Sequence, residues 1–256
     1  MWPLPPAPRP RWLVLLASAA VLTALPAMAH AAPSLDQAPD PTQAAAGIVE
    51  ATNAFRQQQD REPLQVDPRL AKAAADFARF MARTGRFGHR AGGSTPAERV
   101  RAAGYDFCAI AENIAFQFSS AGFTTEGLSE AFTQGWKTSA EHRRNMLLAS
   151  LTETGVGVAQ GTDSGRWYAV QIFGRPESLR RSFSIRNAAD VPITYRVGED
   201  RYRLPPRYTR THYTCEPAEL RVQWPHEQGG ERLTPDDGAA LRIERGGGGE
   251  LRLRGR

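Results

Sequence analysis

The spacing of apolar residues changes from a helical period to a strand period at about residue 150. Before that point, apolar side chains recur every three or four residues, which is the spacing of one helix face. Asp67-Pro68 opens one predicted helix, which ends at Gly85, and a capping box from Thr95 to Glu98 opens another. The pattern predicts five helices over approximately these residues: 43–59, 67–84, 95–103, 125–136 and 139–148.

Strand signals dominate the rest of the chain. Residues 155–160 and 167–173 flank a Thr-Asp-Ser-Gly turn, and this arrangement predicts a β-hairpin. Helices around a small antiparallel sheet make an α+β layered domain. After Pro176, short runs alternate apolar and polar residues, which predicts a small all-β domain, either a sandwich or an open barrel.

The N-terminus has the pattern of a secretory signal peptide. Arg9 and Arg11 precede an apolar core from Leu13 to Leu25, and small residues up to Ala31 offer a cleavage site. The core is shorter than the roughly 20 residues that span a bilayer, which favours cleavage over an uncleaved anchor. We therefore expect export to the periplasm or the medium, with no transmembrane anchor after cleavage. The predicted organisation is a signal peptide (1–31), a Pro-rich linker (32–43), an α+β domain (44–175) and a β-rich C-terminal domain (176–256).

The charge pattern argues against a nucleic-acid partner. The chain has 32 Lys and Arg against 27 Asp and Glu, and its formal charge of +5 falls to +3 without the signal peptide. The basic residues are mostly arginines interleaved with acids along the sequence. Nucleic-acid binding normally shows a one-sided basic patch instead.

Two histidines and one glutamate are the candidates for chemistry. His89 follows the end of a predicted helix, where a side chain can project into a cleft. His142 shares one face of a short helix with Ser139 and Asn145, each one turn away. Glu112 lies inside an apolar run and therefore needs a partner. A buried hydrogen-bonding brace is an equally good interpretation of Glu112.

The two cysteines have two interpretations. Cys108 and Cys215 are the only cysteines, and export to an oxidising compartment permits a disulfide between them. Such a bridge would tie the β-rich domain to the first domain. Two buried free thiols are the alternative.

Ordered motifs over about residues 45–175 connect these candidates to a known family. They are Asn53-Ala-Phe-Arg56, Pro63-Leu64 with Asp67 and Leu70, His89, Arg99 with Gly104-Tyr105, Glu112-Asn113-Ile114-Ala115, Trp136, Ser139-x-x-His142-Arg143-x-Asn145-Met146-Leu147, Gly155-Val-Gly157-Val, and Tyr168-x-Val-Gln171-x-Phe173-Gly174. Together they resemble the CAP superfamily (SCP/TAPS; cysteine-rich secretory, antigen 5 and pathogenesis-related 1 domains), and its bacterial branch most. The resemblance implies an α-β-α sandwich.

The resemblance also implies a polar cleft. In many eukaryotic members two histidines and two acidic residues line it and can bind a divalent cation. His89, Glu112 and His142 match three of these four positions, whereas Ser139 stands where the second acid would be. The three remaining side chains make a candidate zinc ligand set with an open fourth position, or simply a hydrogen-bond network.

Three hypotheses of function follow. The leading one is an exported CAP-domain binding module, with Ser139 and Asn145 beside His89, Glu112 and His142 in its cleft. Its ligand is unknown; an envelope component or a lipid would fit. The alternative is a hydrolase of the cell envelope that uses the same cleft, either with a metal or with Ser139 as nucleophile and His142 as base. The third is an adhesive envelope protein in which the β-rich domain is the active part.

Overall fold

The structure is a computed structural model that describes residues 38–225 and 230–255. The predicted signal peptide and residues 32–37, the first half of the predicted linker, lie outside the described residues. None of the helices in the described part of the chain has the length and apolarity that crossing a bilayer requires.

A four-stranded sheet forms the middle layer of the first domain, in the order β1-β3-β4-β2. The strands are β1 (Gln65–Val66), β2 (Phe107–Gln117), β3 (Glu153–Gln160) and β4 (Trp167–Pro176). The predicted hairpin is confirmed, since β3 and β4 are antiparallel neighbours. Strand β1 was not predicted. It consists of two exposed residues paired in parallel with β3, too short to show any alternation.

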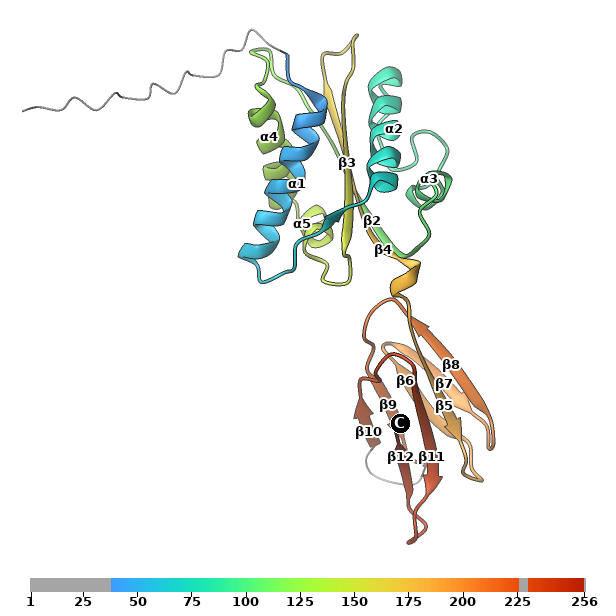
Figure 1. Cartoon of the computed structure of the whole chain (residues 1–256). Helices are drawn as coiled ribbons and strands as arrows, with labels where there is room; N and C mark the ends of the chain where they lie inside the picture. Colours follow the sequence, from blue (N-terminus) through green and yellow to red (C-terminus); the bar gives the residue numbers. More distant parts are fainter. Residues whose placement is uncertain (1–37, 226–229, 256) are drawn as a thin grey trace, which may run out of the picture. The chain divides into compact units, whose positions relative to one another are not determined.

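Helices cover both faces of this sheet, as Figure 1 shows. One layer holds α1 (Pro41–Gln58), α4 (Thr125–Thr138) and α5 (Ala140–Leu147), and the other holds α2 (Pro68–Thr84) and α3 (Pro96–Ala102). The α-β-α sandwich is therefore confirmed. Helix α1 begins two residues earlier than predicted, because Asp40 accepts hydrogen bonds from the backbone nitrogens of Thr42 and Gln43 and acts as its N-cap.

Helix α2 lies unusually close to β3, and two glycines make this possible. A Cβ added to Gly155 would lie 2.0 Å from the backbone nitrogen of Ala71, and one added to Gly157 would lie 2.2 Å from that of Ala75. Neither backbone atom can move without shifting the helix. The Gly155-Val-Gly157 motif is therefore a packing device, and it fixes the height of α2 above the sheet.

A buried arginine holds the chain around α5. The Arg56 guanidinium donates hydrogen bonds to four carbonyl oxygens, those of Glu62, Met146, Leu148 and Leu151. Three of these carbonyls belong to the end of α5 and the loop after it. Arg56 therefore ties α1 to the C-terminal end of α5 and to the segment that leads into β3.

The C-terminal domain is a β-sandwich of two four-stranded sheets, ordered β10-β9-β6-β7 and β12-β11-β5-β8. A short 3-10 turn, Glu177–Leu179, precedes it. The strands are β5 (Arg181–Asn187), β6 (Ile193–Val197), β7 (Asp200–Leu204), β8 (Thr209–Thr214), β9 (Leu220–Gln223), β10 (Gly230–Leu233), β11 (Ala239–Arg245) and β12 (Leu251–Arg254). The predicted all-β domain is confirmed, although β11 pairs in parallel with β5.

The core of the sandwich contains a histidine. His212 is buried, and its Nε2 lies 2.7 Å from the Tyr195 hydroxyl oxygen, within hydrogen-bond distance. Burial lowers the pKa of His212, and the charge of Arg210 lowers it further. Burial also raises the pKa of Tyr195 to about 12, so the hydroxyl keeps its proton for this bond.

The two cysteines form a disulfide, with a Cα–Cα distance of 5.5 Å. It joins Cys108 in β2 to Cys215, which follows β8. The interpretation of two free thiols is therefore wrong.

Candidate ligand-binding cleft

The candidate residues gather around β2, which is an edge strand of the first sheet. Side chains of a strand point alternately to opposite faces of the sheet. Glu112 and Ile114 therefore point to the side of α2 and α3, where Ile114 joins the apolar core, and Asn113 points to the side of α4 and α5. A site on an edge strand can use both sides at once.

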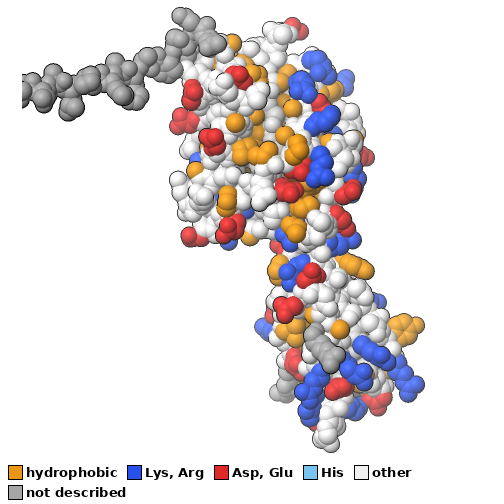
Figure 2. Space-filling view, in the orientation of Figure 1, with side chains coloured by type: hydrophobic (Ala, Val, Ile, Leu, Met, Phe, Trp, Pro, Cys, Tyr) orange, Lys and Arg blue, Asp and Glu red, His pale blue; other side chains and the backbone are white. Residues whose placement is uncertain are grey.

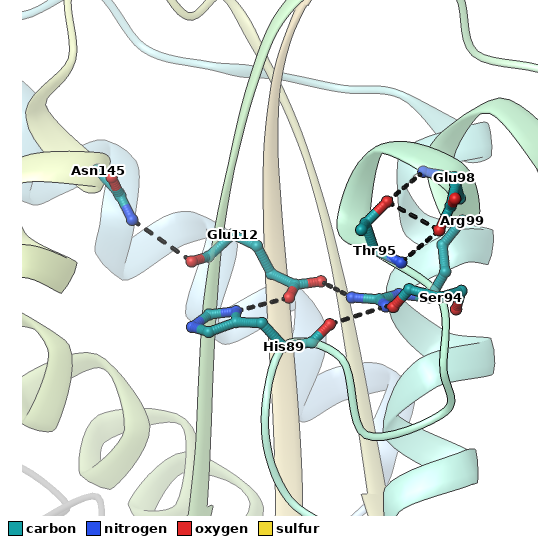
Figure 3. A network of polar contacts seen from close by, with 7 residues as sticks. All are labelled: His89, Ser94, Thr95, Glu98, Arg99, Glu112 and Asn145. Atoms are coloured by element: carbon teal, nitrogen blue, oxygen red, sulfur yellow. Dashed lines mark hydrogen bonds and ion pairs between the residues drawn. The ribbon is translucent and has the colours of Figure 1, made fainter.

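The Glu112 carboxylate is the centre of a polar network (Figure 3). Its side chain is only 2% exposed. One oxygen lies 2.8 Å from Nδ1 of His89, and the other lies 2.6 Å from Nη2 of Arg99. The interpretation of Glu112 as a buried brace is thus supported by its contacts: two nitrogen donors satisfy the buried charge.

Arg99 is the residue that the sequence analysis did not place in the site. It donates from Nη1 to the carbonyl oxygens of His89 and Ser94, at 3.0 and 2.7 Å, and its guanidinium lies 3.5 Å from the centre of the Phe77 ring. The arginine therefore fixes both the loop that carries His89 and the carboxylate that His89 contacts. The available signal was its membership of the family motif and its place in α3, whose predicted capping box is confirmed.

Helix α5 brings His142 and Asn145 to the other side of β2. Asn113 donates to the carbonyl oxygen of His142 at 3.1 Å, and Asn145 donates to the Asn113 side chain at 2.9 Å and to the Glu112 carbonyl oxygen at 3.4 Å. Burial lowers the pKa of His142, and the charge of His89 lowers it further. That second effect indicates that the two imidazoles are near each other.

Ser139 is the N-cap residue of α5, but its side chain makes no capping hydrogen bond. Within the described residues, no hydrogen bond joins Ser139 to His142. The two residues are neighbours on the helix without forming the nucleophile and base pair that a serine hydrolase needs.

The predicted zinc ligand set does not fit the observed contacts. Both Glu112 oxygens are engaged by nitrogen donors, and one of these is the permanently charged guanidinium of Arg99, which opposes a cation at the same carboxylate. Among the residues that the structure describes, no three His, Cys, Asp or Glu side chains are grouped closely enough to hold a metal ion. In this arrangement Glu112 orients His89, and metal binding stays a prediction.

Exposed aromatic side chains adjoin this network. Phe116 points to the same side of β2 as Glu112, and the ring of Phe87 meets it edge-on at 5.2 Å. Phe118 is also exposed. This side of β2 therefore carries the histidine and glutamate network and, further along the strand, an apolar surface.

A separate groove lies between α1 and α4, with a cavity volume of about 660 Å³. Gly47, Ser129 and Lys137 are among its lining residues, and none of the predicted site residues is. It is not part of the cleft.

An α-β-α sandwich with a histidine and glutamate network at the free edge of its sheet defines a CAP-type domain. Residues 49–173 match the model of the Cysteine-rich secretory protein family, CAP. The chain thus carries a bacterial-type domain of the CAP superfamily.

Similar proteins come from several bacteria. YkwD of Bacillus subtilis (strain 168) is 30% identical over 129 residues, which cover 50% of this chain. The match spans only 46% of that relative, about half of its length. Among solved structures, an extracellular protein containing a SCP domain from Bacillus anthracis str. Ames is 26% identical, with a TM-score of 0.45 over 53% of this chain and 41% of that one. An outer surface protein from Borrelia burgdorferi is 18% identical, with a TM-score of 0.48 over 55% of this chain and 98% of that one.

Proposed function

We propose that the protein is an exported binding module whose cleft presents His89 and His142 to a ligand. The observation that carries this proposal is the state of Glu112. Its buried carboxylate is fully engaged and holds a histidine whose side chain is 50% exposed. A carboxylate whose two oxygens are both engaged is not free to take a proton from water itself, so its role in this proposal is to hold the exposed ring for contact with a ligand.

The chemistry of the two imidazoles suggests what the ligand offers. Nδ1–H of His89 donates to Glu112, which leaves Nε2 as the ring nitrogen that can contact a ligand. Burial lowers the pKa of His142, which favours its neutral form. Two imidazoles favour a ligand with hydroxyl or amide groups, and the exposed rings of Phe87 and Phe116 would suit an apolar part of it.

Export is supported by the signal-peptide pattern and by the disulfide, which is typical of oxidising compartments. Two of the similar structures are described as extracellular or outer surface proteins. These observations favour the periplasm or the medium without distinguishing them.

The alternative function is a metal-dependent hydrolase of the cell envelope that uses the same cleft. For that reaction, Glu112 would have to leave Arg99 and act on water or a metal. The proximity of His89 and His142 favours this alternative, and the ion pair of Arg99 with Glu112 opposes it.

The test is retention of the purified mature protein on a washed envelope fraction, compared with His89→Ala and His142→Ala. Gln58→Ala, an exposed position on α1, is the control. We expect the histidine variants to lose binding at least tenfold, and the control to bind like the wild type. Equal retention of all four proteins would exclude the cleft as the binding site.

Two further measurements address the alternative. Zinc titration of the same proteins would support a metal site if only the histidine variants lost affinity. Turnover of peptides, esters or cell-wall fragments that Glu112→Gln abolishes would establish the hydrolase and overturn the binding module.

A further inference from the structure

Four arginines form a straight row across one outer face of the β-sandwich. In sheet β10-β9-β6-β7, Arg201 of β7 is paired with Arg196 of β6, Arg196 with Arg221 of β9, and Arg221 with Arg232 of β10. Residues directly opposite in an antiparallel sheet point to the same face. The neighbours of these arginines, such as Tyr195 and Val222, are buried, so the row faces outward.

The row lines a groove. A cavity of about 520 Å³ on this face is lined by all four arginines together with Thr194 and Gln223, and by one acidic residue, Glu231, whose carboxylate accepts a hydrogen bond from the backbone nitrogen of Leu253. Neighbouring strands lie about 4.8 Å apart, so the four residues span roughly 14 Å in a line perpendicular to the strands. The groove is therefore long, shallow and rich in guanidinium groups.

The positive charge of the row is only partly neutralised. Glu199 pairs with Arg196 at 3.2 Å, and Glu219 pairs with Arg221 at 2.5 Å. In the described part of the chain, no ion pair is formed by the two end residues, Arg201 and Arg232. Like charges placed directly opposite each other destabilise a sheet, so this arrangement has a cost that the fold itself does not require.

The second sheet of the sandwich provides an internal comparison. There Arg242 is paired with Arg254 on β12 and with Arg186 on β5, again in register. Glu244 lies within ion-pair distance of both Arg242 and Arg254, at 3.0 and 3.6 Å. One carboxylate thus serves two of the three guanidinium groups on that face. Among the residues that the structure describes, Arg186 forms no ion pair there, and neither do the two end residues of the groove row.

We propose that the arginine row is the docking surface for a linear, phosphate-bearing polymer of the cell envelope. The planar guanidinium binds two oxygens of one phosphate at once, which the ammonium of lysine does not. Residues 176–256 hold 15 arginines and no lysine, and Figure 2 shows basic side chains on this domain as well as along one side of the first domain. A straight row suits a chain of regularly spaced phosphates, because successive groups meet successive strands.

Protection of the sheet edges does not explain the row. Charged side chains on edge strands discourage edge-to-edge pairing, and Arg201 and Arg232 lie on the edge strands β7 and β10. Arg196 and Arg221 lie on the two inner strands, where no edge needs protection.

The experiment measures binding of long-chain inorganic polyphosphate to the full mature protein by fluorescence anisotropy at low and physiological salt. The double variant Arg201→Gln/Arg232→Gln is compared with Arg242→Gln/Arg254→Gln. The second variant also removes two positive charges, but from the other sheet. We expect the first variant to lose at least tenfold in affinity and the second to stay within about twofold. Because each variant loses two positive charges, non-specific attraction and its screening by salt change equally in both, and only the loss of the row distinguishes them. Both should melt within a few degrees of the wild type, which shows that they are folded.

Three outcomes would overturn the assignment. They are equal losses in the two double variants, equal affinity for polyglutamate of the same charge, and tighter binding of single-stranded DNA than of polyphosphate. Placing the polymer in the envelope rests on the proposed export, but the phosphate binding itself does not. Because His142→Ala should bind polyphosphate like the wild type, failure of the cleft proposal and failure of this one are distinguishable.

Discussion

Removing the guanidinium of Arg99 is the sharpest test of how the cleft is held together. In Arg99→Met the Glu112 carboxylate stays buried and keeps only His89, whose side chain is half exposed and a weaker partner. Breaking a buried ion pair by removing one partner costs about 3–5 kcal/mol. Because His89 and local rearrangement compensate in part, we expect the free energy of unfolding to fall by about 3 kcal/mol.

A double-mutant cycle separates the free energy of the ion pair between Arg99 and Glu112 from that of the other contacts of Arg99. Glu112→Gln removes the charge but keeps the shape, so the double variant Arg99→Met/Glu112→Gln should lose only about 1–2 kcal/mol, mainly the bonds of Arg99 to the His89 loop. The measurement is urea unfolding at pH 7 with the disulfide intact, followed by tryptophan fluorescence. The m-value should be unchanged, because the native fold is the same.

Arg79→Met is the control for this cycle. Arg79 pairs with Asp76 on the exposed side of α2, where both side chains are about half exposed. Exposed pairs contribute about 0–1 kcal/mol. If Arg99→Met cost no more than Arg79→Met, or if the cycle gave no coupling between Arg99 and Glu112, the network would not be what stabilises the cleft.

Three further predictions concern other parts of the molecule. The pKa of His212 is lower in the folded state than in the unfolded state, so the unfolded state binds a proton first as the pH falls. The melting temperature should therefore drop as the pH falls below about 6.5 towards the pKa of His212 in the folded protein. This drop should be less steep in His212→Gln. Gly157→Ala should destabilise by about 1–3 kcal/mol or more by calorimetry, because its methyl group would lie 2.2 Å from a backbone nitrogen of α2. The control is Gly92→Ala, whose methyl group would meet only a ring edge at 3.5 Å; equal effects of the two would contradict the packing argument. Replacing Cys108 and Cys215 by serine should lower the unfolding free energy by up to about 4–5 kcal/mol, and an unchanged urea midpoint would contradict it.

Most of the first domain could be predicted from the sequence because its signals are local. Asp67 and the Thr95–Glu98 capping box mark helix starts by hydrogen bonds within one turn, and both are present as predicted. The α2 stripe is a property of one helix face, and Leu70, Phe77 and Met81 are all buried.

Two strands of the C-terminal domain, β8 and β10, have weak local signals. Strand β8, Thr209–Thr214, buries only His212 through the core face and is otherwise polar. Strand β10 begins with Gly230 and has no fully buried residue. Their pairing depends on neighbours far along the chain, which a pattern within six residues does not contain.

The contacts among the candidate residues could not be predicted from the sequence. The order of His89, Glu112 and His142 indicated a shared cleft, yet Arg99 was recognised only as part of a motif. An ion pair between residues on α3 and β2 depends on how the helix packs on the sheet. The arginine row has the same origin: arginines interleaved with apolar residues along the sequence become aligned only when strand register brings Arg196 opposite its neighbours.

The position of the cleft on β2 also has a consequence for solubility. An unpaired edge strand eleven residues long is a template on which another extended chain could pair and start aggregation. Here the Asn145 side chain donates a hydrogen bond to the Glu112 carbonyl oxygen. Helix α5 is held beside the strand because Asn113 donates to the carbonyl oxygen of His142. The side chains of the polar network thus also blunt the edge of the sheet. A substitution at Asn145 would therefore affect both the polar network around Glu112 and the protection of this edge.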